Sequence, residues 1–492
     1  MVQNNMAIGF TFVVYLALML GIGIVAYKRT TNLSDYILGG RSLGPWTSAI
    51  SAGASDMSGW LLLGLPGAAY VSGISASWIA VGLLIGTWLN WLIVARRLRL
   101  YSFKVSDALT LPEYFANRFQ DKSHLLRVIS AIFILMFFLF YTSSGLVAGG
   151  RLFETVFGFD YRIAVTIGTL TIIMYTFIGG FLAVSWTDLI QGLMMAAALA
   201  IVPIIAFSDL GGASGAGAAL AAESEYMLAW FRDASTGEAL SVIGIVSSLA
   251  WGLGYFGQPH ILARFAAIRS DRDIPAARRI AVSWTAIALV SSIAVGLLGV
   301  GFVQRDLADG ETVFMVMVNL IFHPVIAGIL LAAILAAIMS TADSQLLVSS
   351  SALTDDFYKA IFRKDASQAE LVWVGRFAVI AIAIVAYLLA LNPDATVLDL
   401  VAYAWAGFGA AFGPALIMSL YWRRMNKWGA LAGIVVGGIT VVVWAELSGG
   451  IFDLYEIVPG VIFAYIAIVA ASLATEEPTD AITADFDTFD RT

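Results

Sequence analysis

A carboxylate and two glycines stand within an apolar stretch that is long enough to cross a lipid bilayer. In Ser51–Trp60 (SAGASDMSGW), Asp56 is the carboxylate and Gly53 and Gly59 flank it. A charge at the centre of a bilayer costs about 2.5–3.5 kcal/mol on insertion scales, so such a residue usually has a partner or a function. The glycines predict that the helix opens here and frees carbonyl oxygens. An opened helix with carbonyl and carboxylate oxygens is suited to a small dehydrated cation.

A second polar group interrupts an apolar run later in the chain. Ala337, Ser340 and Thr341 stand at positions i, i+3 and i+4, so they share one face of a helix. One carbonyl and two hydroxyls would form half of an oxygen cage for a monovalent cation, and the freed carbonyls of Ala54 and Met57 would form the other half. The alternative is that the hydroxyls bond to their own helix or to a neighbouring one.

Glycine and proline also interrupt the apolar segment Trp251–His260 (WGLGYFGQPH). Trp251 and Tyr255 are four residues apart and Pro259 follows one turn later, so we expect the three on one helical face. Aromatic rings beside an opened backbone suit a small zwitterion with an apolar ring, and Tyr141 of another span would supply a hydroxyl. The alternative for each aromatic residue is ordinary packing.

Composition defines the class of protein. The chain has 492 residues, of which 60% are hydrophobic and only 12% charged, whereas soluble proteins carry about 25% charged residues. We therefore expect an all-α polytopic membrane protein. Cysteine is absent, which excludes disulfides and thiolate metal sites, and the three histidines form no metal-binding pattern. No nucleophile–base pair is visible and nothing indicates nucleic-acid binding, so we expect no enzyme.

Apolar runs long enough to span a membrane recur along the whole chain. We predict thirteen spans, at about residues 7–27, 46–70, 74–95, 125–149, 162–182, 187–208, 241–263, 280–302, 312–353, 371–391, 396–421, 429–447 and 452–475. The first is predicted to be a retained helix and not a cleaved signal peptide. The ninth is too long for one span and is predicted to include a short lead-in helix. We also expect an interfacial helix around Leu111–Phe119.

Basic residues give the orientation. With the N-terminus outside, all of the 27 lysines and arginines fall on the inner side except Arg151, Arg162, Arg232 and Arg305. This asymmetry agrees with the positive-inside rule, so the C-terminus is predicted to be cytoplasmic.

The two interrupted spans lie five spans apart, and five is odd. The halves should therefore face opposite ways, as in an inverted repeat. We predict a single membrane transporter domain over residues 1–475, with core repeats at about 46–208 and 241–421. Residues 476–492 form an acidic cytoplasmic tail, which is predicted to be disordered.

Three long motifs resemble the sodium/solute symporter family: Ser51–Pro66 (SAGASDMSGWLLLGLP), Gly252–Phe265 (GLGYFGQPHILARF) and Ala336–Leu347 (AAIMSTADSQLL). The resemblance covers nearly the whole chain. It implies a five-plus-five inverted-repeat core of the leucine-transporter type. It also implies that one sodium ion is carried with one L-proline by alternating access across the bacterial inner (plasma) membrane, with membrane lipid around the protein and no obligate protein partner.

The resemblance also assigns residues to roles. Sodium binding is implied for Ala54, Met57, Ala337, Ser340 and Thr341, with Asp56 and Asp188 in sodium coupling. Substrate binding is implied for Tyr141, Trp251, Tyr255, Pro259, Ser58 and Gly59. On the residues alone, Asp188 is either an ion-path residue or a solvated charge at a helix end. Asp343 departs from the family pattern, and we expect it to face a cytoplasmic water path or to pair with a basic residue.

Two alternatives remain open at this point. The first is sodium- or proton-coupled uptake of another small solute, such as a carboxylate, a vitamin or a sugar. The second is a solute-sensing membrane protein, which would usually carry a large cytoplasmic signalling module. An ion channel is disfavoured, because a channel gives no reason for an aromatic pocket beside a second broken helix.

Overall fold

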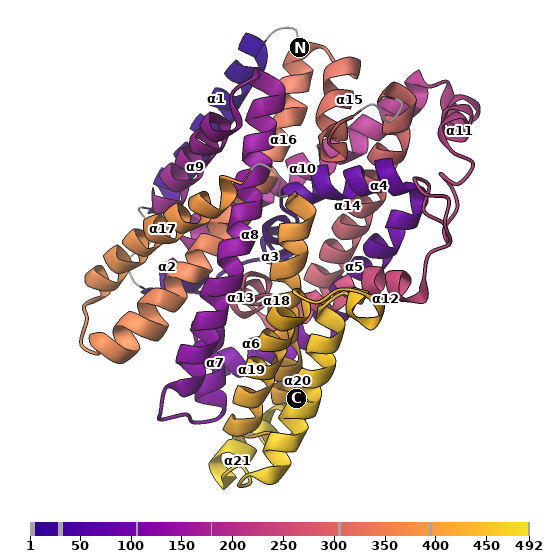
Figure 1. Cartoon of the computed structure of the whole chain (residues 1–492). Coiled ribbons are helices and arrows are strands. Elements are labelled where there is room, and N and C mark those ends of the chain that lie inside the picture. Colours follow the sequence, from indigo (N-terminus) through magenta and orange to yellow (C-terminus); the bar gives the residue numbers. More distant parts are fainter. Residues whose placement is uncertain are drawn as a thin grey trace.

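The computed structural model describes residues 5–27, 33–104, 107–178, 180–303, 307–392 and 396–490. Arg305, which was predicted to lie outside the membrane, falls outside these ranges. The described chain is almost entirely helical, with two isolated β-bridges (Figure 1). Ten of its helical segments are long and apolar enough to cross a membrane, and three shorter apolar helices lie between them.

Long uninterrupted helices build most of the molecule. They are α1 (Asn5–Tyr27), α8 (Leu125–Phe157), α9 (Tyr161–Ile178), α10 (Phe181–Asp209), α14 (Ile274–Val303), α17 (Gln368–Ala390), α18 (Val397–Tyr421), α19 (Lys427–Trp444) and α20 (Ile457–Ala474). Each coincides with one predicted span, with ends that differ by several residues. The all-α membrane fold class is confirmed.

The second and third predicted spans contain several shorter pieces. The second consists of α3 (Pro45–Asp56), the π-helical turn η2 (Trp60–Gly64) and α4 (Leu65–Ser72). The third consists of η3 (Gly73–Ala76), α5 (Ser77–Leu89), a second π-helical turn η4 (Asn90–Val94) and α6 (Ala95–Lys104). Both predicted helix breaks are present, because the seventh span is also divided, into α12 (Val242–Ala250), the 3₁₀ segment η5 (Trp251–Gly257) and α13 (Pro259–Ala267).

The short connecting helices also agree with expectation. The ninth span has a separate lead-in helix, α15 (Val313–Ile321), after the 3₁₀ turn η7 (Gly310–Thr312). The main helix α16 (Pro324–Ser351) follows and continues as the π-helical segment η8 (Ala352–Phe362). The interfacial helix is α7 (Leu111–Arg118). Three further short helices are α2 (Leu33–Leu38), α11 (Gly212–Glu223) and α21 (Asp480–Asp490).

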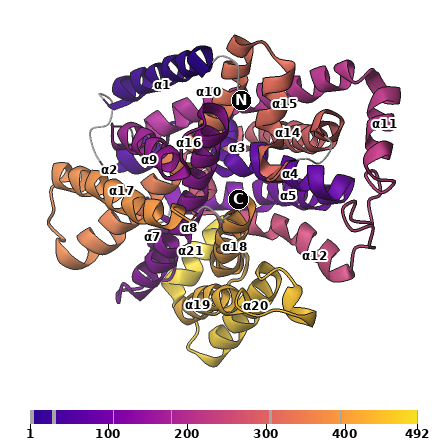
Figure 2. The ribbon, with the colours of Figure 1, turned by 45° about the horizontal axis from the view of Figure 1, so that its top comes forward.

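Helix α16 runs through the interior. It packs against α1, α3, α8, α10 and α17, and nearly all of its residues from Ala327 to Ser351 are buried. Helix α3 also packs against α10, α13 and α14, while α18 packs against η5 and α8. Figure 2 shows α3 and α16 near the middle, with α11, α12, α17, α19 and α20 at the periphery. Both breaks, at Met57–Gly59 and at η5, are therefore in the interior, where freed backbone groups are tolerated.

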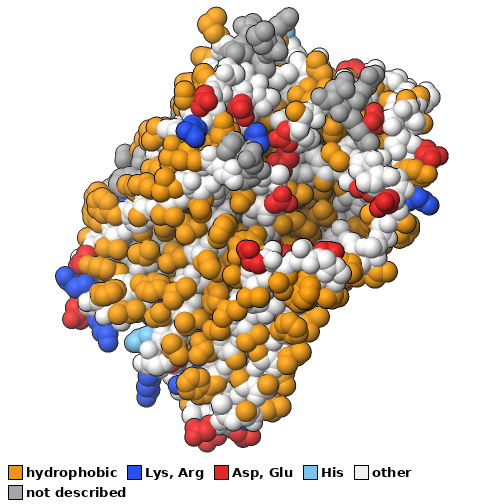
Figure 3. Space-filling model, viewed as in Figure 1, with side chains coloured by type: hydrophobic (Ala, Val, Ile, Leu, Met, Phe, Trp, Pro, Cys, Tyr) orange, Lys and Arg blue, Asp and Glu red, His pale blue; other side chains and the backbone are white. Residues whose placement is uncertain are grey.

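The outer surface fits a lipid environment. In the view of Figure 3, hydrophobic side chains cover a broad area of the lower half of the molecule, with charged side chains mainly around its edges. Large apolar residues such as Phe377 and Leu388 of α17 are more than half exposed. The structure has α1 at one end of the long axis and α21 at the other (Figure 1).

The prediction that the acidic tail is disordered is wrong for residues 480–490. They form α21, which packs Ile482 and Phe486 against the body of the protein. The Arg118 guanidinium lies over the Phe486 ring, 5.3 Å from its centroid. The Asp487 carboxylate accepts two hydrogen bonds from Arg423, at 2.8 and 3.0 Å, which raises the pKa of Arg423. An apolar pair at i and i+4 was the overlooked signal for a docked helix.

Candidate functional site

The first break begins where α3 ends. Met57 has φ −85° and ψ 76°, outside the helical region, and its amide donates the last helical hydrogen bond to Gly53 O at 2.8 Å. The next amide, that of Ser58, turns instead to Asp56 O at 3.0 Å. In a continuous helix the Ser58 amide would bond to Ala54 O. The break therefore frees the Ala54 carbonyl, as the sequence predicted.

Side chains of α16 meet that freed carbonyl. Ser340 Oγ and Thr341 Oγ1 donate to Ala54 O at 2.8 and 3.2 Å, and Ser340 Oγ also lies 3.1 Å from Ala337 O. All four residues are almost completely buried. Two carbonyls and two hydroxyls thus converge at one point, and neutral oxygens of this kind can replace the hydration shell of a sodium ion. Met57, the fifth predicted sodium residue, is buried at the break itself.

Gly53 and Gly59 were predicted to let the helix open, but the structure gives them a different role. Neither Gly53 nor Gly59 has a positive φ, so neither uses the conformations that only glycine adopts freely. A Cβ atom at Gly53 would lie 2.6 Å from the Trp284 ring, and one at Gly59 would lie 2.6 Å from Ala148 Cβ. These glycines are required for close packing of neighbouring helices, and the opening itself occurs between them.

The carboxylate of Asp56 faces the second broken helix. Tyr255 donates its hydroxyl to Asp56 Oδ2 at 2.7 Å, and Oδ1 has no hydrogen-bond partner among the described residues. The backbone carbonyl of Asp56 accepts bonds from Tyr141 Oη at 2.7 Å and from Trp60 Nε1 at 3.2 Å. Tyr141, a predicted substrate residue, therefore supports the break directly, while Ser58 lies within it.

The second break differs in geometry from the expected one. Because η5 is a 3₁₀ helix with three residues per turn, residues four apart do not share a face. The expectation that Trp251, Tyr255 and Pro259 form one aromatic face is therefore wrong. The Trp251 ring lies 6.4 Å from that of Trp60, and Tyr255 turns toward Asp56. Pro259 begins α13, after an extended Gln258.

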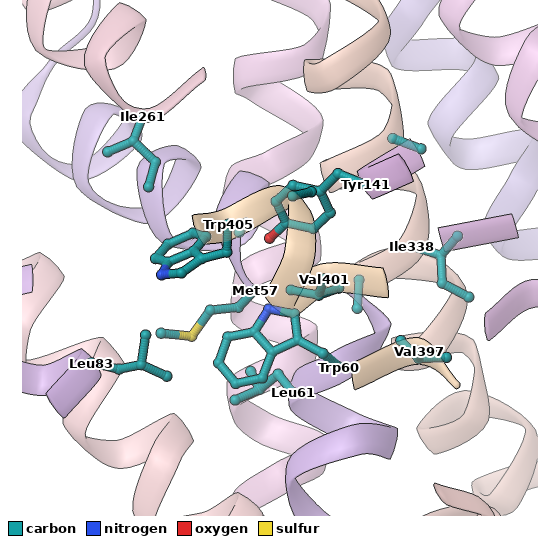
Figure 4. Packing of buried hydrophobic residues seen from close by; sticks show 14 of the residues in the cluster. Met57, Trp60, Leu61, Leu83, Tyr141, Ile261, Ile338, Val397, Val401 and Trp405 are labelled. Carbon is teal, nitrogen blue, oxygen red and sulfur yellow. The ribbon is translucent and has the colours of Figure 1, made fainter. Parts of the chain in front are cut away.

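Aromatic residues nevertheless gather around the first break. Figure 4 shows Met57 and Trp60 close to Tyr141 and Trp405. Trp405 of α18 was not predicted; its Nε1 donates to Trp251 O at 2.7 Å, and its ring meets Tyr255 edge-on at 5.0 Å. Tryptophans are common in membrane proteins, so no feature of the sequence alone separates Trp405 from a packing residue.

Asp188 is part of a buried ion pair. Its Oδ2 accepts bonds from Arg264 Nη2 at 3.1 Å and from Ser51 Oγ at 2.6 Å, and both charged side chains are fully buried. The alternative of a solvated helix-end charge is thereby excluded. Arg264, which the orientation analysis placed among the inner-side charges, also donates to Ser344 Oγ at 2.6 Å. An arginine inside a long apolar motif was the overlooked signal.

Asp343 lies in the same interior region. It is fully buried, and neither carboxylate oxygen has a hydrogen-bond partner among the described residues. Arg264 is the basic residue in its electrostatic surroundings. No ion pair of Asp343 is present among the described residues, so its expected pairing with a basic residue or exposure to a water path stays a prediction; the hydroxyl of the adjacent Ser344 binds Arg264.

A cavity of about 50 Å³ lies next to the second break. Pro259, Leu262 and Ala266 of α13 form one wall, and Leu347 and Ser351 of α16 form another; residues of α6 and α7 complete it. The lining is mostly apolar. The cavity lies between the start of α13, at the second break, and α7.

Comparisons with known proteins agree with this geometry. The family described as "Sodium:solute symporter family" matches residues 36–437. The sodium/proline symporter of Escherichia coli K12 is 52% identical over 479 residues, which cover 96% of this chain and 94% of that protein. The osmoregulated proline transporter OpuE of Bacillus subtilis 168 is 50% identical over 476 residues, 95% of each chain.

Solved structures share the fold. A sodium-coupled sialic acid symporter, in a substrate-bound outward-open state, superposes with a TM-score of 0.79 at 21% identity, covering 96% of this chain and 99% of that one. Mhp1, a nucleobase-cation-symport-1 family transporter, gives a TM-score of 0.57 at 16% identity, covering 93% and 99%.

Proposed function

The chain belongs to the sodium:solute symporter family, and from this premise we propose that it imports L-proline together with sodium by alternating access. The observation that carries the proposal is the freed carbonyl of Ala54, held by the Ser340 and Thr341 hydroxyls of another helix. Relatives that match nearly all of the chain at about half identity are named proline transporters, which supports proline as the solute.

Sodium is the driving substrate. It binds where Ala54, Ala337, Ser340 and Thr341 converge, with Met57 at the break as a fifth ligand, and replaces the direct hydrogen bonds between α3 and α16. Because the ion contacts both helices, its binding favours one arrangement of α3 against α16. Asp56, two residues along α3 from Ala54, transmits this change to Tyr255 of η5. Coupling requires only that sodium and solute favour the same conformations.

The solute binds between the two breaks. The rings of Trp251, Tyr255 and Tyr141 pack against the apolar ring of proline, and Ser58, Gly59 and Pro259 shape the backbone around it. Release toward the cytoplasm takes place through the cavity beneath Pro259. Asp188 supports sodium coupling by fixing Arg264 and Ser51, which connect α13 and α3.

One sodium ion per solute provides enough free energy. A membrane potential of about 100 mV gives about 2.3 kcal/mol per charge, and a tenfold sodium gradient adds about 1.4 kcal/mol. The total of about 3.7 kcal/mol supports roughly 500-fold accumulation of a neutral zwitterion. The protein acts as a transporter and not as an enzyme, in the bacterial inner membrane, surrounded by lipid, with the N-terminus outside and no obligate protein partner.

Reconstitution tests the function. Purified protein in liposomes should accumulate radiolabelled L-proline above its external concentration when sodium is applied outside, and potassium should not substitute. Unlabelled carboxylates, vitamins and sugars should not compete. Accumulation driven by a pH gradient without sodium, or competition by another solute class at lower concentration than proline, would instead support the alternative of another coupling ion or solute.

A further inference from the structure

A small polar cavity lies beside Asp56 and is not used by the sodium residues. Its volume is about 10 Å³, enough for one water-sized group such as a single ammonium, and it lies between α3, α5–η4, η5–α13 and α14. Its polar wall includes Asp56, Thr87, Asn90 and Tyr255, and no residue of α16 lines it. It is therefore separate from the Ala54 carbonyl and the hydroxyls of Ser340 and Thr341.

Buried oxygens in this wall lack partners. Asp56 Oδ1 and Asn90 Oδ1 have no hydrogen-bond partner among the described residues, and Thr87 Oγ1 has only a weak contact with the Tyr255 hydroxyl. The amide of Asn90 is oriented by its own Nδ2, which donates to Tyr255 O at 2.9 Å. Buried polar atoms are nearly always satisfied, so an unsatisfied set indicates a missing ligand or water.

The chemistry of the wall selects the ligand. A carboxylate oxygen and an amide carbonyl oxygen only accept hydrogen bonds, and the Asp56 carboxylate has no Lys or Arg within 4.0 Å among the described residues. Such oxygens accept either a metal cation or a cation with N–H donors. Because the sodium ion is placed between α3 and α16, the complementary group here is the part of the solute that carries at least two N–H donors. A secondary ammonium, which carries two N–H bonds and one positive charge, satisfies Asp56 Oδ1 and Asn90 Oδ1 at once.

We propose that this cavity binds the ring ammonium of the transported solute through Asp56 Oδ1 and Asn90 Oδ1, with Thr87 Oγ1 as a third contact. This inference rests on the proposed function, because it names the part of the solute that the chain recognises. If the ammonium binds there, the same turn of α3 contacts both sodium and the solute. The carbonyl of Ala54 serves sodium and the carboxylate of Asp56 serves the solute, only two residues apart on α3.

The experiment combines variants of the protein with analogues of the ligand. Thr87→Val and Asn90→Leu remove acceptors. Thr169→Val is the matched control, because the Thr169 hydroxyl of α9 donates to its own helix at Val165 O, 2.8 Å away. Binding of L-proline and of tetrahydrofuran-2-carboxylate, which has a ring oxygen in place of the ammonium, is measured on purified protein in saturating sodium by competition with labelled proline.

We expect wild type and Thr169→Val to prefer proline over the analogue strongly. Thr87→Val and Asn90→Leu should weaken proline binding about tenfold or more and leave analogue binding unchanged, because only the ammonium contacts these oxygens. Equal losses for both ligands, or no loss, would overturn the inference. So would a rise in the sodium concentration needed for half-saturation without any change in the preference for proline. Wild type that does not bind proline in sodium would instead refute the proposed function itself.

Discussion

The carbonyl of Ala54 and the carboxylate of Asp56 point to different partners although they are two residues apart. The carbonyl accepts bonds from Ser340 and Thr341 of α16, whereas the carboxylate accepts one from Tyr255 of η5. This division is compatible with the proposed role of Asp56 in sodium coupling without direct contact between its carboxylate and the ion. A charged group at membrane depth is retained only where it has such a function.

The Asp56→Asn variant tests the charge separately from the shape. Asparagine keeps an oxygen that can accept the Tyr255 hydroxyl, so the protein should fold and insert normally. Sodium-driven proline uptake into proteoliposomes should fall to the level of protein-free liposomes, because the negative charge is lost. Uptake with normal sodium dependence in this variant would show that the carboxylate has no role in coupling.

At the scale of elements, glycines determine how closely helices approach. Gly53 of α3 packs directly against the Trp284 ring of α14. Gly53→Ala should reduce the free energy of unfolding by about 1–3 kcal/mol, because an added methyl group must displace a buried ring. The control is Gly217→Ala in α11, where a Cβ would meet nothing within 4 Å. Thermal unfolding in detergent compares them, and a Gly53→Ala protein that melts no lower than the control would contradict the packing argument.

The ion pair between Arg264 and Asp188 joins α13 to α10. Removing one partner of a buried pair leaves an uncompensated charge and costs about 3–5 kcal/mol. We therefore expect Asp188→Asn and Arg264→Gln each to lower the melting temperature. The double variant should lose less free energy of unfolding than the two single variants lose together, because neither charge is then left without its partner. Strictly additive losses would mean that the two side chains act independently.

The sequence predicted the elements better than the contacts between them. Hydropathy located the long apolar helices, and the interruptions of two apolar runs located both breaks, because these signals are local. The orientation inferred from the basic residues stays a prediction. The 3₁₀ form of η5, which separates Trp251 from Tyr255, was not predicted, because backbone geometry at a break depends on tertiary packing. The roles of Arg264, Asn90 and Trp405 depend on contacts over more than seventy residues of sequence separation, such as that from Asn90 to Tyr255, and no single-sequence pattern encodes those.

At the scale of the whole molecule, α21 closes the end of the structure that carries α7. Deleting residues 480–492 would remove the buried side chains of Ile482 and Phe486. Burial of each contributes up to about 1.5–3 kcal/mol to the free energy of unfolding. Such a truncated protein should melt at a lower temperature than wild type. Asp487→Asn should change the melting temperature little, because an exposed ion pair contributes only about 0–1 kcal/mol to stability. A larger effect of Asp487→Asn than of the truncation would mean that charge, and not apolar packing, holds the helix.

The central claim is that sodium between α3 and α16 controls solute binding. It is tested most directly by measuring labelled proline binding to purified wild type, Thr341→Val and Thr169→Val over a range of sodium concentrations in a choline background. We predict that sodium tightens proline binding at least about tenfold in wild type and in Thr169→Val. Thr341→Val should need a higher sodium concentration to reach the same final affinity. Identical sodium dependence in all three proteins would contradict the account.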